Sequence, residues 1–192
     1  ILQAFLGRPD DTPAGDAFER RLYVCRRTIE KKADAEFALR DKIFYVCSMS
    51  SRTIVYKGML VATQMRRFFI DLNDAAVKTA VALVHSRYST NTTPSWERAH
   101  PNRFIIHNGE INTLKGNVNW IRAREPNLYS PVLQHDLERV MPIINREGSD
   151  SAILDNVLEF LVMNGRPLTR AASMLLPEPW DHNDSLSEER RA

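Results

Sequence analysis

The chain has 192 residues, 43% of them apolar, which is enough to form the core of one domain. Its 26 basic and 24 acidic residues leave a formal net charge of +2 and are spread along the sequence, which argues against a nucleic-acid or membrane partner. No apolar run approaches the roughly 20 residues of a membrane span, and two cysteines are too few for a disulfide framework. We therefore expect a cytoplasmic protein.

The first 60 residues predict a helix followed by a strand pair. Apolar side chains recur at spacings of three and four over residues 16–33, which is typical of an amphipathic helix and predicts that Cys25 is buried. Residues 43–48 and 53–60 are rich in β-formers, and the polar stretch between them indicates a hairpin or close strand pair with Cys47 in a strand.

Two more strands are predicted in the middle of the chain. The segment 64–72 is ambiguous, whereas residues 80–89 and 103–111 are apolar runs that favour strands, and a polar loop separates them.

The remaining elements are predicted to be helical. Residues 112–125 have helical spacing, and Pro126 ends that helix. Polar residues 149–151 offer N-cap groups to an apolar run that stops at Asn164-Gly165, and residues 169–176 suggest a further short helix. Strand pairs followed by helices favour an α+β fold over an alternating doubly wound sheet.

Polar groups follow directly after two of the predicted strands, in HSRYSTN (85–91) and HNGEIN (107–112). Arg87 offers a planar fork that matches a carboxylate. Asn108 and Gly109 offer donors of the kind that stabilise an oxyanion during acyl transfer, and Asp150 can pair with an ammonium group. Together these groups suit an amino acid with a side-chain carbonyl, and glutamine fits the set.

Each of these features has a simpler explanation when it is taken alone. An arginine after a strand is usually in a surface ion pair, an Asn-Gly is usually a turn, and an aspartate at a helix start is usually a cap. A metal site and a Ser–His–Asp catalytic site are two alternatives. The histidines 85, 100 and 107 match no standard zinc spacing, and no G-x-S-x-G elbow supports a Ser–His–Asp hydrolase.

Residues 85–120, HSRYSTNTTPSWERAHPNRFIIHNGEINTLKGNVNW, resemble the class II glutamine amidotransferase domain of glutamate synthase large subunits. The segments 44–60 and 148–162 extend the resemblance over most of residues 16–180. It implies that Arg87 holds the glutamine carboxylate, Asp150 binds its amino group, and Asn108 and Gly109 form the oxyanion hole. Three further residues would be neighbours of the glutamine pocket: Thr90, His107 and Glu110.

The resemblance also implies an N-terminal-nucleophile hydrolase fold, a four-layer αββα sandwich with a cysteine at the mature N-terminus. This chain begins with Ile1, and Cys25 and Cys47 both have structural explanations. We therefore expect residues 1–192 to form a single partial amidotransferase domain that lacks the nucleophile and is inactive alone.

In the intact enzyme the resemblance implies that glutamine is hydrolysed to glutamate and that the ammonia passes to a synthase domain of the same polypeptide, where it adds to 2-oxoglutarate. FMN and an iron–sulfur cluster would serve that domain, with a small reductase subunit as a further candidate partner, and no cofactor or metal is expected within these residues. Two alternatives stay open: another class II amidotransferase, such as an amidophosphoribosyltransferase or asparagine synthetase, and a non-catalytic glutamine-binding module.

Overall fold

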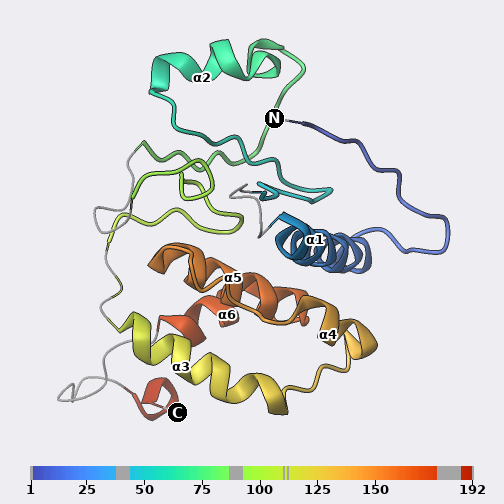
Figure 1. Cartoon of the computed structure of the whole chain (residues 1–192), viewed down its shortest axis with the longest axis vertical. Coiled ribbons are helices and arrows are strands. Elements are labelled where there is room, and N and C mark those ends of the chain that lie inside the picture. Colours follow the sequence, from blue (N-terminus) through green and yellow to red (C-terminus); the bar gives the residue numbers. More distant parts are fainter. Residues whose placement is uncertain are drawn as a thin grey trace.

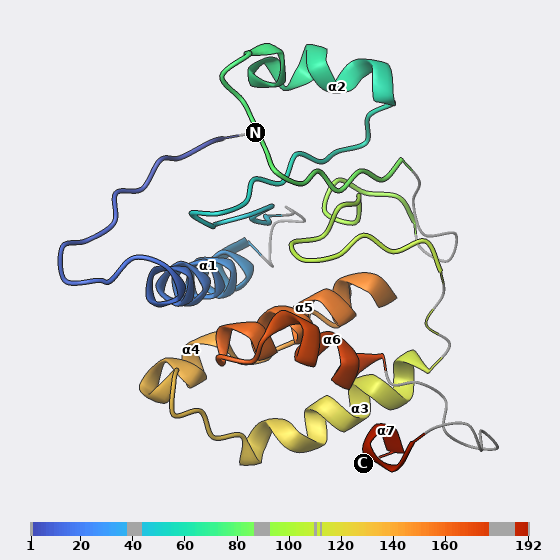
Figure 2. The same ribbon diagram turned by 180° about the vertical axis from the view of Figure 1, so that it is seen from behind.

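The chain folds into a layer of helices, with extended segments and one further helix stacked on it (Figures 1 and 2). The computed structural model describes residues 2–37, 44–86, 93–109, 111, 113–176 and 187–191. The helical layer contains α1 (Asp16–Phe37), α3 (Leu114–Arg124), α4 (Leu137–Val140), α5 (Asp150–Met163) and α6 (Leu168–Leu175). Helix α2 (Ala62–Phe68) lies at the opposite end of the molecule, and the extended segments run between the two.

The described residues also contain four short helical turns. They are η2 (Ile70–Asn73), η3 (Glu125–Asn127), η4 (Gln134–Asp136) and α7 (Glu188–Arg191). None of the helices in these ranges is both long enough and apolar enough to cross a membrane.

The hydrophobic core lies where α1 and α5 meet α4 and the loops beside it. Helix α1 contacts both α4 and α5, and α5 contacts α6. The buried core side chains are Tyr23, Val24, Leu133, Val140, Ile143, Ile144, Ile153, Val157, Phe160 and Met163.

Helix α5 begins and ends where the sequence predicts. Ser149 is the N-cap, and its hydroxyl accepts a hydrogen bond from the Ala152 N–H at 3.2 Å. At the other end Gly165 has φ 85°, a left-handed conformation that only glycine adopts without strain. Local signals at both ends therefore determine the length of this helix.

The other three predicted helices are also confirmed, with small shifts of their ends. Helix α1 extends to Phe37, beyond the predicted 16–33, and α6 lies within one residue of the predicted 169–176. Helix α3 gives way to the turn η3, which contains Pro126, and its side chains Leu114, Val118 and Ile121 pack on the core as predicted.

The prediction that Cys25 is buried is wrong, because the buried side of α1 turns away from this residue. Phe18 and Leu22 of the predicted apolar pattern are buried, but Cys25 is exposed. Tyr23 and Arg26 are buried instead, three residues apart, so the buried side mixes a charged side chain with apolar ones. Apolar periodicity alone therefore does not find the full buried side of this helix.

Ion pairs explain how α1 can bury charged side chains. Arg26 is 1% exposed, and its guanidinium binds Glu159 of α5 at 2.5 Å and Glu30 at 2.8 Å. Arg103 from the extended region adds a contact to Glu30 at 3.0 Å. Each charge in the cluster thus has at least one partner of opposite sign, which offsets part of its desolvation cost.

The predicted α+β four-layer αββα sandwich is wrong, because the described residues contain helices but no β-strand. The segments predicted as strands have no regular secondary structure over the parts described, and they bend at Cys47 and at residues 58–59 and 103–104. They do not form a ladder of backbone hydrogen bonds with one another. Cys47 accordingly lies at a half-buried bend and not in a strand. Residues 43, 87–89 and 110 of the predicted strands lie outside the described residues.

Side-chain acceptors take the place of the missing ladder. At the tip of the segment 44–60, the Ser51 N–H donates to the Glu19 carboxylate of α1 at 2.8 Å. The hydroxyl groups of Ser50 and Ser51 donate to the same carboxylate. The Val55 N–H donates to the Ser48 hydroxyl at 3.2 Å. The chain reverses where the hairpin was predicted, but its polar groups bind side chains instead of a second strand.

We expect Glu159→Ala to lower the free energy of unfolding by about 3 kcal/mol, because it removes one partner of the buried Arg26. Equilibrium urea unfolding of the 192-residue chain measures this change. Glu36→Ala, an exposed change on the same helix as Arg26, is the control and should stay within about 0.5 kcal/mol of the original chain. Equal effects of the two substitutions would contradict a stabilising role for the buried pair.

Candidate functional site

The N-terminus of α5 holds Asp150 in a defined position. One carboxylate oxygen, Oδ1, accepts a hydrogen bond from the Ser151 N–H at 2.7 Å. The other, Oδ2, accepts one from the Ile111 N–H at 3.0 Å. Asp150 therefore binds the first turn of its own helix and also the segment that follows Asn108 and Gly109.

One turn further along α5, Asp155 binds the start of the same segment. Its carboxylate accepts hydrogen bonds from three successive backbone N–H groups, those of residues 103, 104 and 105, at 2.8 to 3.0 Å. Asp155 is 1% exposed. Burial raises the pKa of its carboxyl to about 6, helped by the charge of Glu159 and opposed by the backbone donors.

These two carboxylates hold the Asn108–Gly109 pair from both sides. Asp155 fixes the backbone up to residue 105, and Asp150 fixes it again at residue 111. Asn108 and Gly109 lie between the two attachments, and both are exposed. The geometry thus brings three of the predicted site residues, Asn108, Gly109 and Asp150, to one end of α5.

Gly109 also lies close to the ring of His107. A Cβ atom at position 109 would be 3.2 Å from Cε1 and 3.3 Å from Nε2 of that ring. A side chain at this position would push the imidazole away, so the absence of a side chain lets the backbone pass the ring. Within the described residues, the buried Nδ1 atom of His107 has no hydrogen-bond partner.

The other predicted site residues lie outside the described residues. They are Arg87, Thr90 and Glu110. Their proposed contacts with glutamine stay predictions, as do the roles of the four residues that the structure describes.

The sequence analysis missed the polar side chains that organise this end of α5. Ser151, Asp155 and Glu159, here called the polar stripe of α5, are spaced four residues apart and are all buried. Each binds a different part of the chain: His100, the backbone at 103–105, and Arg26. The signal that could have found them is a regular polar stripe on a helix whose remaining residues are mostly apolar.

Lys57 links the segment 44–60 to the loop that precedes the site. Its ammonium group donates to the Glu97 carbonyl at 2.8 Å and lies 5.5 Å from the centre of the Tyr45 ring. Burial lowers the pKa of Lys57 to about 8. The lysine joins the segment 44–60 to the turn at residues 96–98, within the polar loop that the sequence predicts.

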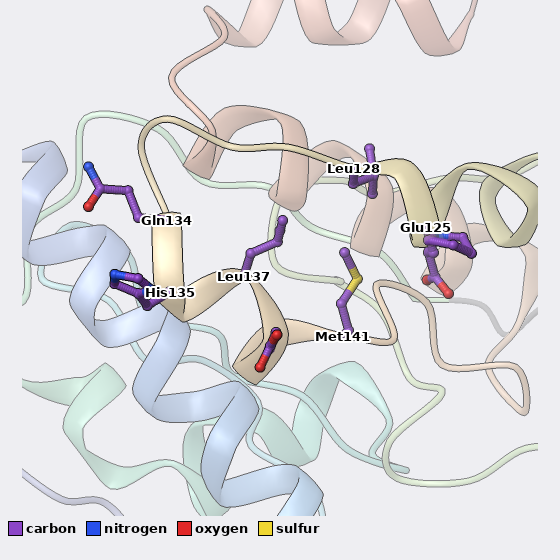
Figure 3. A pocket seen from close by; sticks show the side chains of 8 residues that line it. Glu125, Leu128, Gln134, His135, Leu137 and Met141 are labelled. Atoms are coloured by element: carbon purple, nitrogen blue, oxygen red, sulfur yellow. The ribbon is translucent and has the colours of Figure 1, made fainter.

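Two cavities lie away from the Asn108–Asp150 region. The first, of about 360 Å³, lies between η3 and α4, and Figure 3 shows Leu137 and Met141 between His135 on one side and Glu125 on the other. Glu125 already accepts a hydrogen bond from the Ile143 N–H at 2.8 Å, so it has a structural role. The second, of about 480 Å³, is lined by residues 59–62, Gln64 and Ser86.

No group of three or more His, Cys, Asp or Glu side chains in the described ranges is arranged to hold a metal ion. His85 and His100 do lie together, with ring centres 4.4 Å apart. His100 contacts this ring face and a serine hydroxyl, and neither contact has the geometry of a metal ligand.

Comparison with known families gives a match over the whole chain. Residues 1–192 match the family described as glutamine amidotransferases class-II. This agrees with the resemblance found in residues 85–120.

Curated relatives of this chain are named as glutamate synthases, with different electron donors in their names. The chain is 52% identical, over all of its 192 residues, to 12% of the glutamate synthase [NADPH] large chain of Bacillus subtilis (strain 168). It is 47% identical over 92% of its length to 8% of the glutamate synthase [NADH] of Schizosaccharomyces pombe. It is 44% identical over 97% of its length to 11% of the chloroplastic ferredoxin-dependent glutamate synthase of Oryza sativa subsp. japonica. The chain therefore spans about one eighth or less of these relatives.

We expect Asp155→Asn to change how stability depends on pH. The raised pKa means that folded Asp155 holds its proton more tightly than the unfolded chain does between about pH 4 and 6. Its contribution to the free energy of unfolding is therefore largest below pH 4 and falls by up to about 3 kcal/mol as the pH rises through that window.

Urea unfolding of the original chain and of Asp155→Asn at pH 4, 5, 6 and 7 measures this contribution. The stability of the original chain relative to the variant should fall between pH 4 and 6 and then level off. A difference that is constant or grows over this range would contradict the raised pKa.

Proposed function

We propose that this chain, which belongs to the class II glutamine amidotransferase family, is the glutaminase part of a glutamate synthase. In its native protein it would hydrolyse L-glutamine to glutamate and ammonia. The observation that carries the proposal is the attachment of the Asn108–Gly109 segment to the end of α5 that presents Asp150. The relatives named as glutamate synthases support the finer assignment.

The groups at this end of α5 suit the two ends of glutamine. Asp150 would bind the α-ammonium group, because the carboxylate is half-buried and fixed by two backbone N–H groups. Arg87, from the preceding part of the chain, would bind the α-carboxylate as a bidentate pair. Thr90, His107 and Glu110 would be neighbours of the same pocket.

Asn108 and Gly109 would stabilise the charge that develops on the amide carbonyl of the substrate. A cysteine thiolate attacks that carbonyl carbon, the resulting oxyanion collapses to a thioester, and ammonia leaves. Water then hydrolyses the thioester and releases glutamate. Fixed donors at the oxyanion cost no reorganisation when charge develops, and the attachment of the segment at residues 105 and 111 would supply that rigidity.

Neither cysteine of this chain is proposed as the nucleophile. Cys25 is on the exposed face of α1, and Cys47 lies in the segment 44–60. The family resemblance implies an N-terminal cysteine whose own amino group acts as the base, and we assign the role to such a residue in the native protein.

The ammonia would pass to a synthase domain of the same polypeptide and add to 2-oxoglutarate. FMN and an iron–sulfur cluster would belong to that domain and not to this chain. The sequence of this chain has no glycine-rich phosphate loop, and two cysteines are too few to hold a cluster. A small reductase subunit would be a further partner.

We expect Arg87→Ala and Asp150→Asn to raise the KM of the native protein for L-glutamine by roughly 30-fold or more, because each leaves a charge of the substrate unpaired. Release of ammonia and glutamate from glutamine measures this. Arg122→Ala, an exposed change on α3, is the control and should leave KM unchanged. A folded native protein that never hydrolyses glutamine would reject the proposal and favour a glutamine-binding module.

Asn108→Ala should instead lower kcat, by about 100- to 1000-fold, with little change in KM, because an oxyanion donor acts in the transition state. Single-turnover release of ammonia at saturating glutamine separates this effect from weaker binding. A variant whose KM rises while kcat is retained would assign Asn108 to substrate binding and not to the oxyanion hole.

A further inference from the structure

We propose that His100 is a positioning residue that holds Asp150 in place for the ammonium group of glutamine, acting through Ser151. This inference rests on the proposed function, and it assigns a role to a histidine that neither the substrate contacts nor the oxyanion hole uses. It starts from a hydrogen-bonded chain of buried side chains at the N-terminus of α5.

Three side chains form this series of hydrogen bonds: His100, Ser151 and Ser149. The His100 Nε2 atom is 3.3 Å from the Ser151 hydroxyl, which is 3.1 Å from the Ser149 hydroxyl. The Ser149 hydroxyl accepts the Ala152 N–H at 3.2 Å as the helix cap. The imidazole and both serines are buried, with exposed fractions of 7%, 3% and 1% for His100, Ser149 and Ser151.

The two serines in these contacts are the sequence neighbours of Asp150, and one of them binds its carboxylate. Ser149 and Ser151 are the residues on either side of Asp150, and the Ser151 N–H donates directly to Asp150 Oδ1 at 2.7 Å. A displacement of Ser151 would therefore move the donor that fixes one oxygen of the carboxylate. The Ile111 N–H fixes only the other oxygen.

His100 is itself held by a second ring. The centre of the His85 ring lies 4.4 Å from that of His100, with 33° between the ring planes. In the sequence His85 stands two residues before Arg87, the proposed carboxylate ligand. The pair of rings thus connects the chain that leads to Arg87 with the helix that carries Asp150.

The surroundings keep the His100 ring neutral. Burial lowers its pKa to about 4, and His85, Lys57 and His107 act in the same direction, against the opposing charge of Asp150. A neutral ring adds no positive charge beside Asp150, so the carboxylate stays available for the ammonium group of the substrate. The ring acts as a hydrogen-bonding support and not as a counter-ion.

The test compares two substitutions of His100 in the native protein. The amide nitrogen of glutamine reaches the place of Nε2, whereas the amide of asparagine stops short of it. His100→Asn should raise KM for L-glutamine about tenfold with kcat within about twofold, and His100→Gln should stay near the wild type. His135→Asn, an exposed histidine on η4, is the matched control and should have no effect.

Two further variants separate positioning from a general loss of structure. Ser151→Ala removes the same hydrogen bond from the other side and should also raise KM about tenfold, even if His100→Asn does not fold. Adding His100→Asn to Asp150→Asn should raise KM by less than about twofold more, because His100 acts only through that carboxylate.

The outcomes keep the two proposals apart. An active wild type whose KM is unchanged in both Ser151→Ala and His100→Asn overturns the positioning role alone. An additive effect in the double variant overturns it as well. A native protein that releases no ammonia from glutamine overturns the proposed function, and this inference with it.

Discussion

The polar stripe of α5 is the constraint on which the arrangement of the chain depends. A helix that buries polar side chains needs a partner for each of them, because an unpaired buried polar group costs about 1 to 3 kcal/mol or more. Ser151 and Asp155 find these partners in the segment 100–105, and Glu159 finds its partner on α1. Helix α5 therefore packs against its neighbours in one way, whereas apolar contacts alone would allow it to slide or rotate.

The same stripe links stability to the proposed chemistry. Glu159 joins α5 to the buried arginine of α1, Asp155 binds the backbone that leads to Asn108, and Ser151 supports Asp150. The carboxylate proposed to bind substrate and the segment proposed to stabilise the oxyanion are thus fixed to one rigid helix. A site whose charged groups and hydrogen-bond donors are already in position before the reaction benefits from such an attachment. These groups then need little reorganisation in the transition state.

The parts of the fold that were predicted correctly depend on local signals. The cap at Ser149, the stop at Gly165 and the break at Pro126 each act within a few residues, so the sequence around them is sufficient. The sheet and the burial of Cys25 were predicted wrongly because the pairing of polar groups is not local. A run of β-forming residues can donate its backbone hydrogen bonds to a helix carboxylate instead of to another strand, as residues 103–105 do to Asp155. The residues within such a run do not indicate which of these partners it will have. The candidate site residues Asn108, Gly109 and Asp150 were proposed from the chemistry of their side chains and backbone, and their roles stay predictions. The buried groups beside them were not predicted, because their partners lie far away in the sequence.

The relatives add a constraint on how the whole enzyme is divided. Three of them are named for three different electron donors, NADPH, NADH and ferredoxin, yet each is 44% to 52% identical to this chain. If this region handles only glutamine and the release of ammonia, its buried contacts and substrate ligands face the same demands whichever donor is used. The identity of the electron donor would then place no demand on these residues, because under the proposed function the electrons would be used in the synthase domain. The polar stripe, which serves the packing of α5 and the geometry of the proposed site, is the kind of feature that such a division would allow all three to share.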